Sequence, residues 1–333
     1  MAKRYYIAAD GGGTKLLAVL YDEDRAVVRS ARTRGTNTLF RPKEAVLSEA
    51  EELAGELIPP EVSAVEGVDF SIVGDSSPYL DAFRRRCTLG DVRGHGEGHV
   101  ALASAGVRYG VAAQAGTGSD AFFIQPGVNT GVGGWGMVLG DEGGGFDIGL
   151  KTLRAAVWSQ DGRGEKSVLP DLLKEAWGMK DLWEMVNRVS GNPDMRSLVA
   201  SVTHITEKAA AMNDPAAVAI YQSAGHELAL QVLAAVRNGG GTFTGPVIAS
   251  GGAWKGSRHM FETFRSEVAA VHPEAEIRFP DFEPLVGSVI LRMMKEDGSS
   301  DESTHMAHLC KTFSAFRYKL PPDYVPERTD QGR

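Results

Sequence analysis

The sequence predicts an α/β fold built from two similar halves with a cleft between them. Each half begins with an apolar, strand-like run that ends in a glycine turn, and strands and helices alternate after both turns. These turns lie at residues 10–15 and 116–119, and a third glycine turn follows another apolar run at 250–254. Because glycine has no Cβ, such turns let backbone N–H groups approach a phosphate closely. Three of them indicate a nucleotide held from several sides, and clefts between domains are favoured ligand sites.

The bulk composition is typical of a globular protein with two domains. The chain has 333 residues, of which 43% are hydrophobic and 23% are charged. A net charge of −8 argues against a nucleic-acid surface as the main partner. Cys87 and Cys310 lie far apart, which provides neither a disulfide framework nor a zinc set. Without a signal-peptide core or a bilayer-length apolar run, we expect a cytoplasmic protein without a membrane partner, and we leave a homodimer open.

The first half is expected to begin with strands at 5–10, 16–21 and 27–31, because short apolar runs joined by tight turns are typical of antiparallel hairpins. Residues 42–58 show the apolar spacing of a helix and end at two prolines. A strand, a helix and a strand are then expected at 68–73, 78–87 and 91–94.

The second half repeats this pattern. Residues 111–115 and 121–124 are expected to form a hairpin, and residues 214–237 the longest helix, which ends at three glycines. Further helices are expected at 146–158, 168–177, 179–190, 195–211 and about 256–270, with strands at 246–249 and 276–278.

We place an N-terminal domain at 1–96, a C-terminal domain at 97–297 and a polar tail at 298–333. The last helix of the second half, at about 284–296, is a candidate to pack back on the N-terminal domain. The final stretch of the tail, from the two prolines at 321 and 322, is expected to be extended or disordered.

The first glycine turn carries the residues of a phosphate site. Asp10 ends a strand, where its carboxylate would face the cleft, and Lys15 adds positive charge. Backbone and hydroxyl donors would come from Gly11, Gly12, Gly13 and Thr14. A carboxylate beside a phosphate site is typical of a Mg²⁺ ion between them, which makes Asp10 the candidate metal ligand. Taken alone, the turn is explained equally well as a glycine-rich β-turn that joins two strands.

The other two turns offer similar donors. Phosphate would bind to Gly116, Thr117, Gly118 and Ser119, although a plain hairpin turn can have the same composition. The third turn precedes a helix, which suits contact with a nucleoside at a helix N-terminus. Its candidate residues are Gly251, Gly252, Ala253 and Trp254. Taken singly, Trp254 is better explained as a packing residue.

A segment rich in glycine and acidic residues lies at 131–145. It places Gly134 and Trp135 a few residues before the adjacent carboxylates of Asp141 and Glu142. Adjacent carboxylates are costly to bury unless they meet donors or cations. Sugar hydroxyls are suitable donors, and an indole can pack on the face of a sugar. A flexible acidic loop is the alternative.

Two single residues complete the candidates. Asn37 follows the third strand, and its amide could pair with a sugar hydroxyl or serve only in a turn. Glu97 precedes an apolar helix, where it could accept a proton from an attacking hydroxyl or provide only a helix N-terminal charge. His95 and His99 flank Glu97, but no further ligand cluster in the sequence supports a metal there.

Together these motifs resemble the N-acetylglucosamine kinase branch of the sugar kinase, heat-shock chaperone and actin superfamily. That branch is grouped with the BadF/BadG/BcrA/BcrD-type ATPases, which activate benzoyl-CoA and hydroxyacyl-CoA enzymes. Residues 10–15 and 116–119 are similar to its two phosphate motifs, and residues 250–255 to its adenosine motif. Residues 133–143 are similar to the kinases in both residues and spacing, and residues 35–37 to their sugar-contacting loop.

The resemblance implies two actin-like, ribonuclease H-like domains with ATP and Mg²⁺ in the cleft. It also implies transfer of the γ-phosphoryl group to a hydroxyl of N-acetylglucosamine or a related amino sugar. The first two turns would hold the phosphates and the third the adenosine. The sugar would be held by Asn37, Gly134, Trp135, Asp141 and Glu142, and Glu97 would act as the base.

One position departs from the family pattern. These kinases carry a catalytic aspartate where this chain has Glu97, whose carboxylate reaches one methylene further. Positioning dominates phosphoryl transfer, so a displaced carboxylate costs rate. Two alternatives stay open: a protein of this fold that binds ATP and sugar with weak or no kinase activity, and a BadF-type activator ATPase. Cys87 and Cys310 are a poor ligand set for the iron–sulfur cluster of such an activator.

Overall fold

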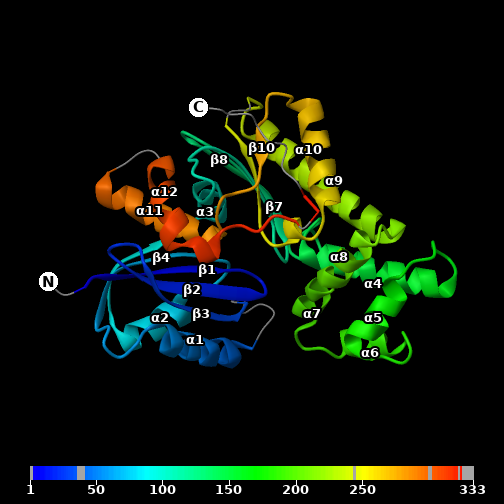
Figure 1. Ribbon diagram of the computed structural model, residues 1–333, viewed down its shortest axis with the longest axis horizontal. Helices are drawn as coiled ribbons and strands as arrows, with labels where there is room; N and C mark the ends of the chain where they lie inside the picture. Colours follow the sequence, from blue (N-terminus) through cyan, green and yellow to red (C-terminus); the bar gives the residue numbers. More distant parts are fainter. Residues whose placement is uncertain (1–2, 36–41, 243–244, 299–301, 322, 325–333) are drawn as a thin grey trace.

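A computed structural model describes residues 3–35, 42–242, 245–298, 302–321 and 323–324, and these form two five-stranded sheets of the same topology (Figure 1). The first sheet has the order β3-β2-β1-β4-β5 and the second the order β8-β7-β6-β9-β10. In each sheet the first three strands are antiparallel, and the last two strands run parallel to the first. The predicted α/β fold of two similar halves is confirmed.

The first sheet is buried on both faces. It consists of β1 (Tyr5–Gly11), β2 (Lys15–Asp22), β3 (Val27–Arg34), β4 (Ala64–Ile72) and β5 (Thr88–Gly94). Along β1, Ile7 and Ala9 pack with α1 (Lys43–Leu57) and α2 (Ser77–Arg86). The alternate residues Tyr6 and Ala8 pack with α11 (Pro284–Asp297) on the opposite face. Because both faces of β1 are buried, its sequence is a nearly continuous apolar run.

The second sheet is covered in the same way. It consists of β6 (Gly110–Ala115), β7 (Ser119–Gln125), β8 (Val128–Gly133), β9 (Val247–Ser250) and β10 (Ile277–Arg278). Val111 and Ala113 on β6 belong to the cluster that includes α9 (Pro215–Asn238) and α10 (Arg258–Val271). Ala112, between them, faces α3 (Glu97–Ser104).

The helix that follows the last strand of each sheet packs on the other sheet. Helix α3 follows β5 of the first sheet but packs on β6 and β7, whereas α11 follows β10 of the second sheet but packs on β1 and β4. The two helices also contact each other. Gly287 allows this close approach, because a Cβ there would lie 2.0 Å from the carbonyl oxygen of Val100. The strand-to-helix junction at residues 94–97 therefore lies between the halves and positions Glu97 there.

Five helices between β8 and α9 have no counterpart in the first half and gather at one end of the molecule (Figure 1). They are α4 (Gly145–Asp161), α5 (Leu169–Trp177), α6 (Glu184–Ser190), α7 (Met195–Ser201) and α8 (Thr203–Ala211). We refer to them as the helical insert.

Three sequence predictions in the second half were wrong in detail. The single helix expected at 195–211 is two, because the Thr203 hydroxyl donates to the Ala200 carbonyl (2.8 Å) and competes with the backbone at the break. Helix α6 begins at Glu184 rather than 179, since the Glu184 carboxylate accepts from the backbone N–H of Asp181 (3.1 Å) and caps a turn there. The edge strand β8 was missed because its residues are mainly glycine and polar.

The tail predicted at 298–333 forms helices in its described part, and most of its final stretch, residues 322 and 325–333, lies outside the described residues. Its described part contains the short 3-10 helices η2 (Glu302–His305) and η3 (Ser314–Phe316), with α12 (Met306–Thr312) between them. Leu309 and Phe313 are fully buried against the first sheet. The chain then crosses to the second half (Figure 1, red). There Tyr318 stacks on Phe279. We call residues 302–321, 323 and 324 the C-terminal strap.

Candidate functional site

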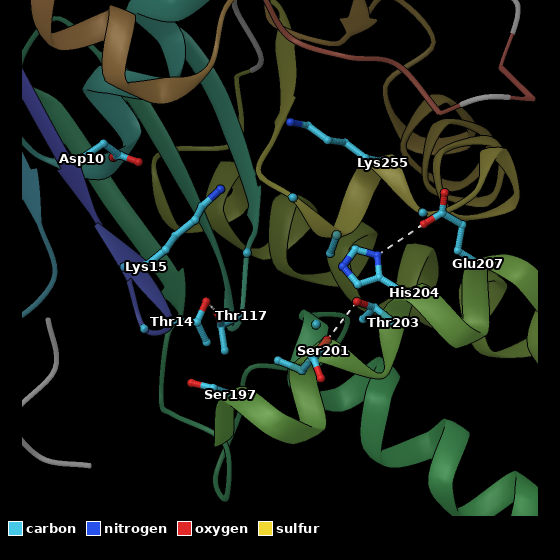
Figure 2. A pocket seen from close by; sticks show the side chains of 18 of the residues that line it. Asp10, Thr14, Lys15, Thr117, Ser197, Ser201, Thr203, His204, Glu207 and Lys255 are labelled. Atoms are coloured by element: carbon cyan, nitrogen blue, oxygen red, sulfur yellow. Dashed lines mark hydrogen bonds and ion pairs between the residues drawn. The ribbon is translucent and has the colours of Figure 1, made fainter. Parts of the chain in front are cut away.

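A cavity of about 520 Å³ lies where the three glycine turns meet. Its lining includes residues 10 and 12–15 from the first turn, 116 and 117 from the second, and 252 and 253 from the third. The opposite wall is formed by Ser197 on α7 and by Thr203, His204 and Glu207 on α8 (Figure 2). The volume is within the usual range for small-molecule sites. The structure therefore brings the three predicted turns to one ligand-sized cavity.

Asp10 lies at the end of β1, on the same side of the cavity as Lys15 (Figure 2). Burial raises the pKa of Asp10 to about 7; the charges of Glu97 and Glu283 add to this effect, and the charge of Lys15 opposes it. A carboxylate in such surroundings is stabilised by a nearby cation. Mg²⁺ is commonly held by one or two carboxylates together with substrate phosphates, so the single carboxylate of Asp10 fits that ion.

The first two turns contact each other through their threonines. The hydroxyl oxygens of Thr14 and Thr117 lie 2.9 Å apart (Figure 2). A Cβ placed on Gly12 or Gly116 would meet no atom within 4 Å, so the backbone of both turns is open to the cavity. Phosphate oxygens could therefore approach the N–H groups of both halves at this junction.

Not every residue of the second turn faces the cavity. Ser119 is only 3% exposed, and its hydroxyl donates to the Glu142 carbonyl (2.6 Å) and accepts from Gln231 (3.1 Å). Gly118 lies against Asp141, because a Cβ on Gly118 would lie 2.6 Å from the carboxylate carbon. These two residues support the turn from behind, whereas Gly116 and Thr117 line the cavity.

The third turn contributes backbone rather than the predicted indole. Trp254 is fully buried, and its indole N–H donates to the Ala113 carbonyl (3.0 Å). It packs edge-on against Phe264 in the core of the second half. Gly252 and Ala253 line the cavity, while the carbonyl of Gly251 accepts a hydrogen bond from the Tyr318 hydroxyl (2.7 Å). The placement of Trp254 thus favours the packing interpretation and removes its side chain from the adenosine contacts.

Glu97 begins α3 beside a second carboxylate, Asp120. Asp120 shares one face of β7 with Phe122 and Ile124, and both of those side chains contact α3 at Gly98, where a Cβ would lie 2.6 and 3.0 Å from their atoms. Burial raises the pKa of Glu97, and the charge of Asp141 adds to this effect. Burial also raises the pKa of Asp120, with contributions from the charges of Glu97 and Asp141. We call Glu97, Asp120 and Asp141 the acidic cluster.

Asp141 is held by an arginine that the sequence did not single out. Arg196 on α7 donates to the Asp141 carboxylate (3.1 Å), and the two side chains are 11% and 5% exposed. The guanidinium also packs on the first turn, since a Cβ on Gly13 would lie 3.1 Å from its nitrogen. Asp141 therefore lies between the second turn and the helical insert rather than in an open acidic loop.

The other predicted sugar residues lie at the edge of this region. Trp135 is 74% exposed and Glu142 is also exposed, although the Glu142 backbone carbonyl accepts from Ser119 and Gln231. Gly134 lies next to Asp120, because a Cβ placed on Gly134 would lie 3.6 Å from a carboxylate oxygen of Asp120. Asn37 lies outside the described residues.

Sequence reasoning missed Asp120 and Arg196. Asp120 directly follows the second turn, and the alternation of side chains along a strand could have revealed that it faces away from Ser119. No local signal marks Arg196, which comes from a helix more than fifty residues after Asp141 in the chain. Its role depends on how the helical insert packs.

Within the described part of the chain, no group of three or more His, Cys, Asp or Glu side chains is arranged to hold a metal ion. Cys87 is buried and Cys310 exposed, and neither forms a disulfide. None of the helices among the described residues is long and apolar enough to cross a membrane.

The known proteins that resemble this chain include several that are named as sugar kinases. A curated N-acetylmuramic acid/N-acetylglucosamine kinase from Clostridium acetobutylicum is 27% identical over 300 residues, which cover 86% of this chain and 98% of the relative. Among solved structures, a protein from Chromobacterium violaceum, provisionally described as an N-acetylglucosamine kinase, aligns with a TM-score of 0.60 at 23% identity. That alignment covers 86% of this chain and 98% of the other.

A ROK family glucokinase from Streptomyces griseus, solved with glucose and AMPPNP, has the same fold. Its TM-score is 0.57 at 16% identity, over 86% of this chain and 98% of that one. The sequence pattern of the BadF/BadG/BcrA/BcrD ATPase family matches residues 9–291, which include the three glycine turns, the acidic cluster and Arg196. The chain therefore belongs to the BadF/BadG/BcrA/BcrD ATPase family.

Proposed function

We propose that this protein transfers the γ-phosphoryl group of ATP to a hydroxyl of an N-acetylated amino sugar. The observation that carries the proposal is the junction of two glycine turns from different halves, with Thr14 and Thr117 in contact at 2.9 Å, next to the acidic cluster. The name of the Clostridium relative supplies the substrate class, N-acetylglucosamine or N-acetylmuramic acid.

The nucleotide would occupy the cavity of about 520 Å³. Its phosphates would accept hydrogen bonds from the backbone of Gly12, Gly13 and Gly116 and from the two threonine hydroxyls. Its adenosine would lie between Gly252–Gly256 and the start of α8, which form the far part of the lining. We assign no nucleotide contact to the buried side chains of Ser119 and Trp254.

Asp10 would hold Mg²⁺ together with the phosphates, and the ion would neutralise phosphate charge when bound. Lys15 lies beside Asp10 and adds a second positive charge at the same end of the cavity (Figure 2).

Glu97 would act as the general base. Its raised pKa makes its carboxylate a better proton acceptor at neutral pH than an exposed glutamate. The sugar hydroxyl would lose its proton to the Glu97 carboxylate as its oxygen bonds to phosphorus. Phosphoryl transfer depends mainly on positioning, so the fixed place of Glu97 at the start of α3 matters as much as its pKa.

The sugar would lie over the acidic cluster. Asp120 faces this space from β7, and the nearby Gly134 leaves room beside its carboxylate. We retain Trp135 and Glu142 as rim contacts and Asn37 as a further contact. Asp141 would act mainly through its ion pair with Arg196.

The test is phosphate transfer from ATP across a panel of sugars: N-acetylglucosamine, N-acetylmuramic acid, glucosamine and glucose. Turnover with an N-acetylated sugar, at a rate that depends on Mg²⁺, is the expected result. Failure of all four sugars would contradict the proposal. Calorimetry separates the alternatives, because sugar binding without turnover would identify a binding protein of the same fold.

A further inference from the structure

The ion pair between Asp141 and Arg196 lies between the two phosphate-binding turns. On one side, a Cβ at Gly118 would lie 2.6 Å from the Asp141 carboxylate carbon; on the other, a Cβ at Gly13 would lie 3.1 Å from an Arg196 guanidinium nitrogen. Each charged group therefore packs directly on the backbone of one turn. Gly13 also lines the cavity, so the guanidinium lies directly beside the cavity lining.

This pair is poorly explained by stability alone. Both side chains are about nine-tenths buried, at 11% and 5% exposure. Removing two charges from water costs several kcal/mol per ion, and a well-packed apolar pair is often at least as stable. A buried pair at a ligand site is better explained by what it does to the ligand. Ser197, the next residue on α7, lines the cavity (Figure 2), so the same helix reaches the cavity.

The surrounding charge adds a requirement for a cation. Phosphoryl transfer to a sugar at the acidic cluster brings a phosphate towards Glu97, Asp120 and Asp141, and like charges repel at short range. Among the basic residues that line the cavity, Lys15 lies beside Asp10, Lys255 is paired with Glu283, and Arg32 belongs to β3. Arg196 contacts both the acidic cluster, at Asp141, and the first turn, at Gly13.

We propose that Arg196 binds the γ-phosphate of ATP and stabilises the charge on the phosphoryl group as it is transferred. The proposal rests on the proposed kinase function. In the step, the bond from the γ-phosphorus to the oxygen bridging to ADP breaks, and a bond to the sugar oxygen forms. The hydroxyl proton goes to Glu97, and ADP leaves with the bridging oxygen. Arg196 stays unchanged, and its planar fork of donors allows it to contact Asp141 and a phosphate together.

The experiment compares two ligands that differ by the γ-phosphate. Affinities for ADP and for a non-hydrolysable ATP analogue are measured by calorimetry with Mg²⁺, for the wild type, Arg196→Gln and Arg196→Lys. Arg196→Gln should weaken binding of the analogue about tenfold or more and change ADP binding less than about twofold. Arg196→Lys keeps the charge but loses the planar fork of donors, so its affinity for the analogue should lie between those of the wild type and Arg196→Gln.

Arg163→Gln is the matched control. This arginine lies in the loop after α4 of the helical insert, and its side chain is 59% exposed and pairs with Asp161. It should bind both ligands like the wild type. In sugar turnover, Arg196→Gln should also lower kcat by about a hundredfold or more.

Equal weakening of ADP and analogue binding, or no weakening of either, would overturn the proposal and leave Arg196 a structural role. If Arg196→Gln does not fold, Arg196→Lys carries the same comparison. The binding comparison needs no sugar. A wild type that phosphorylates no sugar would therefore contradict the proposed function while the test of Arg196 still stands.

Discussion

At the scale of single residues, Glu97 is subject to two opposing influences. It begins α3, where the helix dipole favours a negative charge. Burial and the charge of Asp141 act in the opposite direction and raise the pKa of Glu97. The surroundings therefore make the carboxylate a readier proton acceptor, which suits a base that takes a proton from a sugar hydroxyl.

We expect Glu97→Gln to lower kcat by about 10²- to 10⁴-fold, because the amide keeps the shape of the side chain but accepts no proton. The KM for ATP should stay near the wild-type value. Glu97→Asp withdraws the carboxylate by one methylene and should cost up to about a hundredfold. Steady-state kinetics on the three proteins is the measurement. If Glu97→Gln keeps the wild-type kcat, Glu97 is not the base.

The pH dependence of the reaction follows from the same neighbours. Glu97 accepts a proton only when ionised, so activity should fall as the pH drops through its pKa. The negative charge of Asp141 raises that pKa. Asp141→Asn should therefore lower the pKa and move the acidic limb of the normalised kcat/KM profile to lower pH. Asp171→Asn removes an exposed carboxylate on α5 and should leave the limb in place. A limb that moves to higher pH in Asp141→Asn would contradict this account.

At the scale of elements, adjacent residues at the start of strand β7 have different roles, because their side chains point to opposite faces of the sheet. The Ser119 side chain points inward to Glu142 and Gln231, whereas Asp120 points to the α3 face. Thr117 precedes the strand and keeps its hydroxyl beside Thr14. The turn before β7 therefore lines the cavity with its first residues, and the start of the strand anchors the turn.

Two substitutions separate these roles. Ser119→Ala should lower the free energy of unfolding by about 1 kcal/mol, because it removes a buried hydrogen bond, and should raise the KM for ATP less than Thr117→Val does. Thr117→Val should raise the KM for ATP about threefold to tenfold with little effect on unfolding. Urea titrations and initial rates measure the two effects. The reverse pattern would show that Ser119 contacts the nucleotide.

The elements that could be predicted from the sequence are those that a short run of neighbouring residues specifies. The glycine turns and the strands before them are visible as short apolar runs with glycine, and their roles as cavity-lining turns depend on backbone alone. The indole of Trp254 is different, because only the packing of α10 shows that it is buried. Arg196 and Asp141 meet only when the helical insert folds against the second turn. Long-range packing of this kind leaves no periodicity to detect.

At the scale of the whole molecule, the C-terminal strap contacts both halves. It is buried against the first sheet at Phe313 and then pairs with the second half, where the Tyr318 N–H donates to the Asp281 carbonyl (3.0 Å). The Tyr318 hydroxyl donates to the Gly251 carbonyl (2.7 Å), and its ring lies 4.5 Å from the Lys255 ammonium. Residues beyond the matched family region thus support the third glycine turn.

We expect Tyr318→Phe to raise the KM for ATP about threefold to tenfold, because the third turn loses one hydrogen bond that holds its backbone. The KM for the sugar should not change. Tyr21→Phe is the control, since the Tyr21 hydroxyl is buried and has no hydrogen-bond partner among the described residues. Initial rates at varied ATP and varied sugar measure both. An unchanged KM for ATP in Tyr318→Phe would show that the strap does not position the turn.

The exchange of helices between the halves also bears on how the chain reaches this structure. One face of the first sheet, with Tyr6, Val19 and Tyr21, is covered by α11 and by the strap from the far end of the described chain. Contacts between such distant segments are slow to form. During synthesis, the apolar residues of these strands would stay exposed to solvent until α11 is made, and exposed apolar strands are prone to aggregation. The last helices made would complete the core that the first strands begin.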